Sequence, residues 1–347
     1  IGKNIFKSAF IIEDGKPVTN LHYYHELKKN DISLLHLDEE AGIFVSGEEI
    51  WKNELDLRLR PEVLSDTDYI FAWGSFQEKH FKNRDSLLPD SHIINAGHPK
   101  YDLCKPRFRG YYQEEIEKIK AKYGSFILIN TKMGMANHLL GSKGTFGEEY
   151  MPFTTNYPEQ RARAVREWAY QNRVLTNFTV LLHKLCAILP DKTFVLRPHP
   201  CEDLDFYKHA FTGVKNIHID KTGSVHPWIM AADMVIHDEC TTGVESFLAE
   251  VPTISYKSVE SEEFEIILPN QCGVNCKTHE EVVRAIIDAE QAPESFAKKN
   301  SLTPLMKSLL KNIESDTYDD FFNMINKIIE EKRSKNTHSS KISIFKF

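Results

Sequence analysis

The chain has 347 residues, which is enough for two domains of ordinary size. Hydrophobic residues make up 41% of the sequence and charged residues 27%, a balance that excludes a disordered chain. The formal net charge of −7 argues against a nucleic-acid partner, and no apolar run approaches the ~20 residues of a spanning helix. Because the sequence begins at Ile1 rather than at methionine, we expect it to be a piece of a longer protein.

Six cysteines are spread along the chain without the spacing of a disulfide framework. Cys272 and Cys276 are the one close pair, and no second cysteine or histidine pair follows them. We therefore expect reduced structural thiols rather than a zinc site, and we predict neither a metal ion nor a cofactor.

Short apolar runs alternate with amphipathic stretches in the first third of the chain, as is typical of a parallel sheet with crossover helices. Strands are predicted at residues 7–12, 32–37, 69–73 and 92–95. Helices are predicted at residues 22–30 and 112–123, and Gly124 ends the second of them.

A second series of elements follows. Its strands are predicted at residues 126–130, 193–196, 216–219, 234–236 and 253–256. Its helices are predicted at residues 158–189, 202–211, 226–232 and 242–250, and three more at 280–290, 305–313 and 318–332.

These elements predict an α/β fold with two Rossmann-like domains that face each other across a cleft. The first domain is expected at residues 1–124, on the acceptor side, and the second at 125–300, on the nucleotide side. C-terminal helices are expected at 301–333 and a mobile basic tail at 334–347. Ligands bind at the carboxyl ends of the strands in such folds, so polar residues that follow strands are the candidate site residues.

The first candidate group consists of Asp38, Glu39 and Glu40, directly after a predicted strand. Adjacent carboxylates repel one another and raise at least one pKa, which suits a general base or a group that stabilises a cation. Gly42 permits a tight turn after them. A solvated acidic loop that caps the next helix is the alternative.

The second group is Arg197, His199 and Pro200, within the sequence RPHP at the end of another strand. Two prolines stiffen the backbone there, and the arginine and histidine supply donors suited to a phosphate or a sugar carboxylate. A stiffened turn with a hydrogen-bonded histidine is the alternative.

The third group opens a helix with Thr241 and Thr242. Hydroxyls and backbone N–H groups at a helix start suit a phosphate, and plain N-capping by either threonine is the alternative. The carboxylate of Glu245, in the same helix, would accept hydrogen bonds from ribose hydroxyls or complete a capping box.

Two further strand ends carry polar residues. His98 and Lys100 are predicted either to contact an acidic substrate at the cleft or to form a structural turn. Asn130 and Lys132 are predicted to line the ligand pocket of the second domain. The glycines that follow them do not form a Walker loop, because no Gly-Lys-Ser/Thr sequence closes the spacing.

The order of these motifs resembles that of bacterial GT-B glycosyltransferases that use CMP-activated acidic sugars, namely sialyltransferases and Kdo transferases. More specifically, the sequences LDEEAG, GHPKYDL, ILINTKMGMAN, VLRPHPCE and ADMVIHDECTTGVESFLAEVPTISY resemble the bacterial surface carbohydrate biosynthesis family. The resemblance extends from about Leu35 to Tyr256, through most of both predicted domains.

The resemblance implies roles for individual residues. Glu39 and Glu40 match the acidic pair that contains the catalytic carboxylate, His199 and Pro200 match the His-Pro motif that contacts the nucleotide phosphate, and the threonine pair matches hydroxyls that hold donor phosphate. Ala41 departs from the pattern because it precedes the motif's glycine. This insertion leaves open which of the three carboxylates acts.

The resemblance implies a cytoplasmic glycosyltransferase of surface-polysaccharide synthesis. The expected donor is a CMP-activated acidic sugar, either Kdo or a nonulosonic acid, and the expected acceptor is a glycan or lipid-linked glycan. The basic tail with its terminal apolar residues predicts peripheral contact with the inner membrane. Two alternatives stay open: a two-Rossmann epimerase such as those acting on UDP-N-acetylglucosamine, and a non-catalytic nucleotide-sugar-binding subunit of a polysaccharide assembly.

Overall fold

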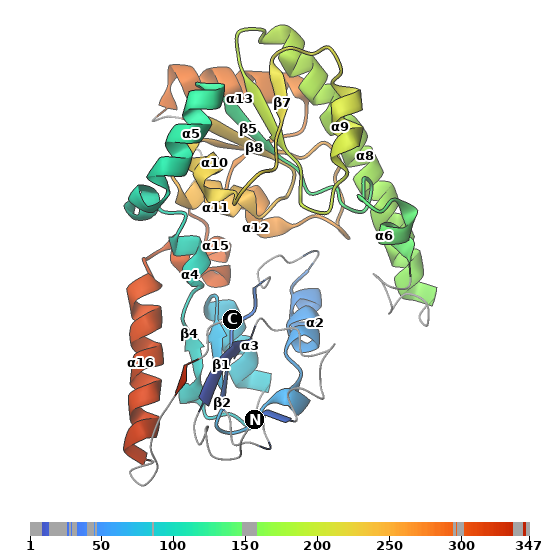
Figure 1. Cartoon of the computed structure of the whole chain (residues 1–347). Coiled ribbons are helices and arrows are strands. Elements are labelled where there is room, and N and C mark those ends of the chain that lie inside the picture. The colour runs from blue at the N-terminus through green and yellow to red at the C-terminus, as the bar shows by residue number, and fades with distance from the viewer. Residues whose placement is uncertain are drawn as a thin grey trace. The chain divides into compact units, whose positions relative to one another are not determined.

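The computed structural model of the chain divides into two compact units (Figure 1). Unit 1 consists of Ile1–Asp102 and Leu302–Phe347, and unit 2 of Leu103–Ser301. The structure describes residues 9–13, 26–27, 29, 33–39, 45, 47–84, 87–147, 158–293, 296, 302–335 and 343–344. Each unit contains its own parallel sheet with helices, so the predicted α/β fold with two Rossmann-like domains is confirmed.

Unit 1 contains a parallel sheet in the order β11-β1-β2-β3-β4. Every residue of β2 and β3 is buried, as expected for parallel strands covered on both faces. The strands are β1 (Ala9–Glu13), β2 (Ser33–His36), β3 (Tyr69–Ala72), β4 (Ile93–Asn95) and β11 (Ser343–Ile344). The helices are α2 (Glu48–Arg58), η2 (Pro61–Val63), α3 (Ser75–Arg84), η3 (Asp90–His92), α4 (Pro99–Asp102), α15 (Pro304–Leu309), η5 (Lys311–Ile313) and α16 (Tyr318–Lys335).

Unit 2 contains a parallel sheet in the order β10-β9-β8-β5-β6-β7. Counted from the first strand of the unit, this is the order of the dinucleotide-binding Rossmann fold, whose ligand site lies where the strand order reverses. Here the reversal lies between β5 and β8. The strands are β5 (Ile127–Asn130), β6 (Phe194–Arg197), β7 (Ile217–Ile219), β8 (Met234–His237), β9 (Thr253–Tyr256) and β10 (Val274–Cys276).

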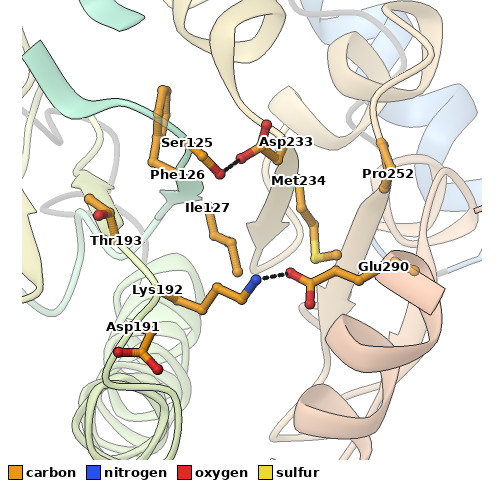
Figure 2. A pocket seen from close by; sticks show the side chains of 11 residues that line it. Ser125, Phe126, Ile127, Asp191, Lys192, Thr193, Asp233, Met234, Pro252 and Glu290 are labelled. Atoms are coloured by element: carbon orange, nitrogen blue, oxygen red, sulfur yellow. Dashed lines mark hydrogen bonds and ion pairs between the residues drawn. The ribbon is translucent and has the colours of Figure 1, made fainter. Parts of the chain in front are cut away.

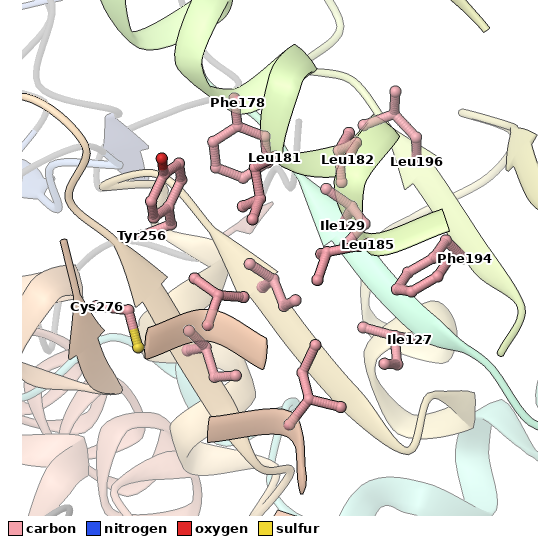
Figure 3. Close-up of a cluster of buried hydrophobic side chains, with 14 of the residues drawn as sticks. Ile127, Ile129, Phe178, Leu181, Leu182, Leu185, Phe194, Leu196, Tyr256 and Cys276 are labelled. Carbon is pink, nitrogen blue, oxygen red and sulfur yellow. The ribbon is translucent and has the colours of Figure 1, made fainter. Parts of the chain in front are cut away.

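The helices of unit 2 cover both faces of this sheet. They are η4 (Pro106–Tyr112), α5 (Gln113–Tyr123), α6 (Ser142–Phe146), α8 (Pro158–Ile188), α9 (Leu204–Ala210), α10 (His226–Ala231), α11 (Thr242–Leu248), α12 (Ile267–Gln271) and α13 (His279–Gln291). Figure 3 shows the core beneath α8, where Leu181 and Leu185 pack on Ile127 and Ile129 of β5. Each such leucine contributes about 1.5–3 kcal/mol through burial.

The boundary between the units lies after Asp102, whereas the sequence predicted it at Gly124. The reason is the apolar face of α5. Ile116 and Ile119 are buried in one cluster with Trp228 of α10, on the face of the unit 2 sheet opposite α8. The charged helix therefore belongs to the second unit, although its sequence gives no sign of the partner.

The C-terminal helices do not form a separate element, because they pack on unit 1. Lys311 N donates to Trp73 O at 2.8 Å, and the ring centroids of Phe321 and Phe71 are 5.0 Å apart. A side chain at Gly74 would collide with the backbone of α15, so this close approach requires glycine. Two distant stretches of the chain thus build one unit.

The tail differs from the predicted mobile segment at residues 334–347. Helix α16 continues to Lys335, and Ser343–Ile344 pair with β1 in parallel. Residues 336–342 and 345–347 of the tail, Glu40, and most of the helix predicted at 22–30 lie outside the described residues. Within the described part of the chain, no helix has the length and apolar content needed to cross a membrane.

His237, the last residue of β8, is buried without exposure. Neither ring nitrogen has a hydrogen-bond partner among the described residues, and burial lowers the pKa of this imidazole to about 3. The first turn of α11 lies directly against the ring, so a side chain at Gly243 would collide with the imidazole. A neutral histidine at the end of β8 therefore packs against the first turn of α11.

This burial predicts a pH dependence of stability. The unfolded chain binds a proton at His237 below its pKa of about 6.5, whereas the folded chain does not until about pH 3. Stability is therefore lost as the pH falls through this range, by up to about 1.4 kcal/mol per pH unit. Urea unfolding from pH 7 to 5 should give a flatter pH slope for His237→Gln than for wild type. His218→Gln, which changes an exposed histidine, should keep the wild-type slope. Equal slopes in all three proteins would contradict the prediction.

Candidate functional site

The parallel register of unit 2 places three predicted motifs at one edge of the sheet. Asn130, the last residue of β5, pairs with Arg197 at the end of β6 and with His237 at the end of β8. The loops that carry the remaining predicted residues of this unit leave from these strand ends, beside the reversal of strand order. The structure therefore brings together residues that sequence analysis found separately.

Glu202 joins the loops that follow β5 and β6. Its Oε1 atom accepts hydrogen bonds from Thr131 Oγ1 (2.8 Å), Met133 N (3.0 Å) and His199 N (3.1 Å). Its Oε2 atom accepts a hydrogen bond from Tyr207 Oη of α9 at 2.5 Å. Burial raises the pKa of this carboxyl, and the four donors oppose the rise. The carboxylate thereby fixes both loops to each other.

Asp238 and Glu239 follow β8 and are 5% and 7% exposed. Lys132 N donates to Asp238 Oδ1 at 3.0 Å, and Tyr170 Oη donates to Glu239 Oε1 at 3.0 Å. Burial raises the pKa of both carboxyls, and the charge of Glu202 raises that of Asp238 further. Glu239 has φ of 48°, so the backbone is strained at this edge of the sheet.

Arg197 ends β6 as predicted, but its guanidinium is engaged elsewhere in unit 2. It donates to Thr222 O at 2.8 Å and to Gly223 O, and it lies over the ring of Trp228 at 5.3 Å. Burial lowers the pKa of the guanidinium. These contacts hold the loop after β7, which gives Arg197 a structural role that the sequence did not indicate.

His199 and Pro200 are exposed at the same edge. His199 is held through its backbone by Glu202, and Pro200 O accepts a hydrogen bond from Lys221 Nζ at 3.2 Å. The imidazole Nδ1 atom lies 2.9 Å from Cys201 Sγ. The ring therefore sits in a fixed turn at the surface.

The threonine pair does not cap α11 as the alternative interpretation proposed. Thr241 is the N-cap residue, yet its side chain makes no capping hydrogen bond, which also excludes a capping box with Glu245. Thr242 is 9% exposed, and its carbonyl accepts a hydrogen bond from Ser246 Oγ at 2.6 Å. The first backbone N–H groups of the helix already donate to Cys240 O and Thr241 O.

Glu245 belongs to a buried chain of polar groups. Its Oε1 atom lies 3.9 Å from His226 Nε2, and His226 Nδ1 lies 3.1 Å from Tyr112 Oη. Burial raises the pKa of Tyr112 to about 12, so this hydroxyl keeps its proton. Glu245 Oε2 has no hydrogen-bond partner among the described residues. One oxygen of this buried carboxylate is thus left without a partner among the described residues.

Asn130 and Lys132 also lie at this edge. Asn130 is 2% exposed, and its Nδ2 atom has no partner within the described part of the chain. The half-buried Lys132 ammonium opposes the rise in the pKa of Asp238 and Glu239, so its positive charge stabilises both carboxylates. The edge thus combines one cation, one amide and the acidic groups behind them.

In unit 1, the acidic motif has two different environments. Asp38 accepts a hydrogen bond from Arg58 Nη1 at 3.0 Å, and its backbone oxygen accepts one from Trp73 Nε1 at 2.6 Å. Asp38 therefore ties the end of β2 to α2 and β3. Glu39 is 49% exposed, which leaves it accessible to a ligand. Glu40, the third member, lies outside the described residues.

The structure also joins Glu39 to the two other predicted residues of unit 1. His98 Nε2 lies 3.5 Å from Glu39 Oε1, and Lys100 Nζ lies 2.6 Å from Glu39 O and 3.6 Å from Oε2. The nearby His98 ring and the Lys100 charge lower the pKa of Glu39, while burial lowers the pKa of His98. Lys100 also lies over the rings of Trp73 and Tyr101. A carboxylate is thus held ionised beside a neutral histidine.

His98 is fixed from behind by the C-terminal part of unit 1. The backbone N–H of His98 donates to Asn312 Oδ1 at 2.8 Å, and the backbone carbonyl of His98 accepts a hydrogen bond from Asn312 Nδ2 at 3.0 Å. Asn312 also donates to Thr317 Oγ1, which in turn donates to Asp102 Oδ2 at 2.7 Å. The C-terminal helices thereby set the position of the histidine beside Glu39.

Several residues of these clusters were not predicted from the sequence. Glu202 and Cys201 directly follow RPHP, so their place at a strand exit was a usable signal. Tyr112 and His226 are 114 positions apart, and no local pattern connects them. Among the described residues, no group of three or more His, Cys, Asp and Glu side chains is arranged to hold a metal ion.

Figure 2 shows a pocket at the opposite edge of the unit 2 sheet. Its lining includes Ile127 and Met234, the first residues of β5 and β8. Three of its charged groups have neighbouring partners: Lys192 Nζ lies 2.5 Å from Glu290 Oε1, and Ser125 donates to Asp233. The predicted site residues lie at the other ends of the same strands, so we assign no ligand to this pocket.

Comparison with known proteins identifies the fold. No protein-family model and no curated protein matches the sequence. Solved structures do match. One is the UDP-GlcNAc 2-epimerase of Methanocaldococcus jannaschii in complex with UDP-GlcNAc and UDP, with a TM-score of 0.52 and 14% identity over 94% of this chain and 76% of that one.

Two further structures resemble the chain to the same degree. The UDP-GlcNAc 2-epimerase of Neisseria meningitidis bound to UDP-GlcNAc has a TM-score of 0.54 and 12% identity over 93% of this chain and 76% of that one. The wall teichoic acid polymerase TagF, as a variant soaked with CDPG, has a TM-score of 0.52 and 10% identity over 97% and 91% of the two chains. At these identities the likeness establishes a GT-B-like fold of two Rossmann-like domains.

Proposed function

We propose that the chain is an enzyme of bacterial surface-glycan synthesis that acts on a nucleotide-activated sugar as a glycosyltransferase. One observation carries the proposal. The unit 2 sheet has the strand order of a nucleotide-binding fold, and its reversal point is flanked by strand ends that carry Asn130, Lys132 and His199. Structures of similar fold have been solved with UDP-GlcNAc, UDP and CDPG, which supports a nucleotide-linked ligand.

Within this proposal, unit 2 binds the nucleotide end of the donor. Lys132 supplies a positive charge and His199 a donor for phosphate oxygens, and Thr241 adds a partly exposed hydroxyl at the start of α11. Glu245, whose Oε1 atom lies near His226 and whose Oε2 atom lacks a hydrogen-bond partner among the described residues, is assigned to the ribose hydroxyls. We expect Arg197 to act indirectly, through the loop that it holds.

Unit 1 supplies the reacting carboxylate. In the transfer, the bond between the anomeric carbon and the phosphate oxygen breaks, the acceptor oxygen bonds to that carbon, and its proton passes to a base. Glu39 is ionised and accessible, and His98 and Lys100 stabilise its charge. An ionised carboxylate suits either proton acceptance or support of an oxocarbenium-like transition state. Glu40 is the second candidate for this role.

We propose a CMP-activated acidic sugar as the donor, on the motif resemblance given above. A UDP-sugar epimerase is the second candidate, because two of the reported structures of similar fold are UDP-GlcNAc 2-epimerases.

One assay distinguishes the two reactions. The chain is incubated with CMP-sialic acid, CMP-Kdo or UDP-GlcNAc, with and without a lipid-linked glycan acceptor. Acceptor-dependent release of nucleotide supports the transferase, whereas an epimerised nucleotide sugar formed without acceptor supports the epimerase. Nucleotide binding without turnover would exclude both enzymatic activities and favour a non-catalytic binding subunit.

The first prediction for this site concerns His199→Ala. Loss of one hydrogen bond to a charged phosphate should weaken nucleotide binding by about 1.5–3 kcal/mol, or roughly tenfold or more. Titration calorimetry with CMP and UDP measures the change, and circular dichroism checks that the fold is kept. His209→Ala, which removes an exposed histidine from α9, should bind as wild type does. The assignment fails if folded His199→Ala binds with unchanged affinity.

The second prediction concerns the acidic motif. Glu39→Gln should lower turnover by about 10²–10⁴-fold with little change in donor affinity, because the group acts on the reacting centre. Asp38→Asn should mainly lower stability, since it weakens the contact with Arg58. Steady-state kinetics on these variants and on Glu40→Gln locate the base. Near-normal turnover in all three variants would exclude the acidic motif as the source of the catalytic carboxylate.

A further inference from the structure

His199 lies in a turn that fixes its tautomer. The backbone N–H of Cys201 donates to His199 Nδ1 at 3.3 Å. A backbone N–H can only donate, so Nδ1 acts as the acceptor and the neutral ring carries its proton on Nε2. The same turn recurs at His98, where Lys100 N donates to Nδ1 at 3.2 Å, and at His138. At His199, however, a second donor is present.

That second donor is the thiol of Cys201. Its Sγ atom lies 2.9 Å from His199 Nδ1, on the same nitrogen that the backbone N–H addresses. Burial and the charge of Glu202 raise the pKa of the thiol, so it keeps the proton that it donates. The thiol and the backbone therefore hold the imidazole together.

The thiol is also confined on its other side. A side chain at Gly134 would collide with Cys201 Sγ, so the loop after β5 packs directly against it. Both neighbours of the thiol are fixed by Glu202, which accepts hydrogen bonds from Met133 N and His199 N. Cys201 is partly exposed, whereas the other five cysteines are buried. The thiol therefore lies between the His199 ring and the loop after β5.

We propose that Cys201 is a positioning residue for His199, whose thiol holds the imidazole with Nε2–H presented to a phosphate oxygen of the donor. Chemical modification of the thiol then displaces the ring and weakens nucleotide binding. This inference rests on the proposed function for the phosphate ligand. The position and tautomer of the ring are properties of the chain alone and can be tested without a ligand.

The first test measures the tautomer directly. Long-range ¹H–¹⁵N correlation spectra of the full chain, labelled at histidine, report which ring nitrogen carries the proton, and His199→Gln assigns the signal. Wild type should show one Nε2–H form with Nδ1 as acceptor. Cys201→Ala keeps the backbone donor and so the Nε2–H form, but its ring signal should be shifted or broadened because the thiol no longer holds the ring. Cys201→Ser, which keeps a side-chain donor, should restore the wild-type signal. Identical spectra for wild type and Cys201→Ala would overturn the proposal, whether or not nucleotide binds.

The second test links the thiol to binding. Cys201→Ala should weaken CMP or UDP binding about fivefold, the effect of one neutral hydrogen bond, while Cys201→Ser stays near wild type. Cys186→Ala, which alters a buried thiol of α8, is the matched control and should bind normally. N-ethylmaleimide should label Cys201 before the other cysteines, nucleotide should slow that labelling, and the labelled chain should lose nucleotide affinity.

The outcomes separate the two proposals. If wild type binds neither CMP nor UDP, the phosphate assignment of His199 fails, and the spectra alone decide the role of Cys201. If wild type binds nucleotide while Cys201→Ala and the labelled chain bind equally well, the positioning role is overturned and the proposed function stands.

Discussion

The carboxylate of Glu202 is the interaction on which the unit 2 edge depends. It is buried, and it accepts hydrogen bonds from two loops and from α9 at once. A buried carboxylate is stable only when its oxygens are satisfied, so neither loop can move without exposing an unpaired charge. The loops after β5 and β6 carry Lys132 and His199, and their common anchor fixes the distance between these two groups. The edge is therefore preorganised before any ligand arrives.

The two units use the same chemical device for different purposes. In both units, a His-Pro sequence forms a turn in which the backbone N–H of the residue after the proline donates to Nδ1 of the histidine. The remaining N–H of the ring then serves as a donor. His98 directs it toward Glu39 within unit 1, where it helps to hold the carboxylate ionised. His199 carries it at the exposed edge of unit 2, where an anionic ligand would accept it.

Local pattern was sufficient for much of the fold. β9 was predicted with the observed bounds, β5 and β8 differ by one residue at one end, and β6 is shifted by one residue. Buried parallel strands are short apolar runs that end at polar motifs, which makes them visible in the sequence. Pairings between distant residues were not predictable in this way. The engagement of Arg197 with Thr222 and the return of Asn312 to His98 depend on tertiary contacts that leave no periodic signal. The acidic motif follows β2 as predicted, but only the structure separates Asp38, paired with Arg58, from the accessible Glu39.

Hydrogen–deuterium exchange of the full chain, with and without saturating CMP or UDP, tests the central claim most directly. We place the nucleotide at the carboxyl edge of the unit 2 sheet. We therefore expect added protection in the peptides that contain residues 130–134, 197–202 and 238–243, at the carboxyl ends of β5, β6 and β8 and directly after them. Protection confined to residues 191–193, 233–234 and 289–290, around the pocket at the amino edge, would contradict the account.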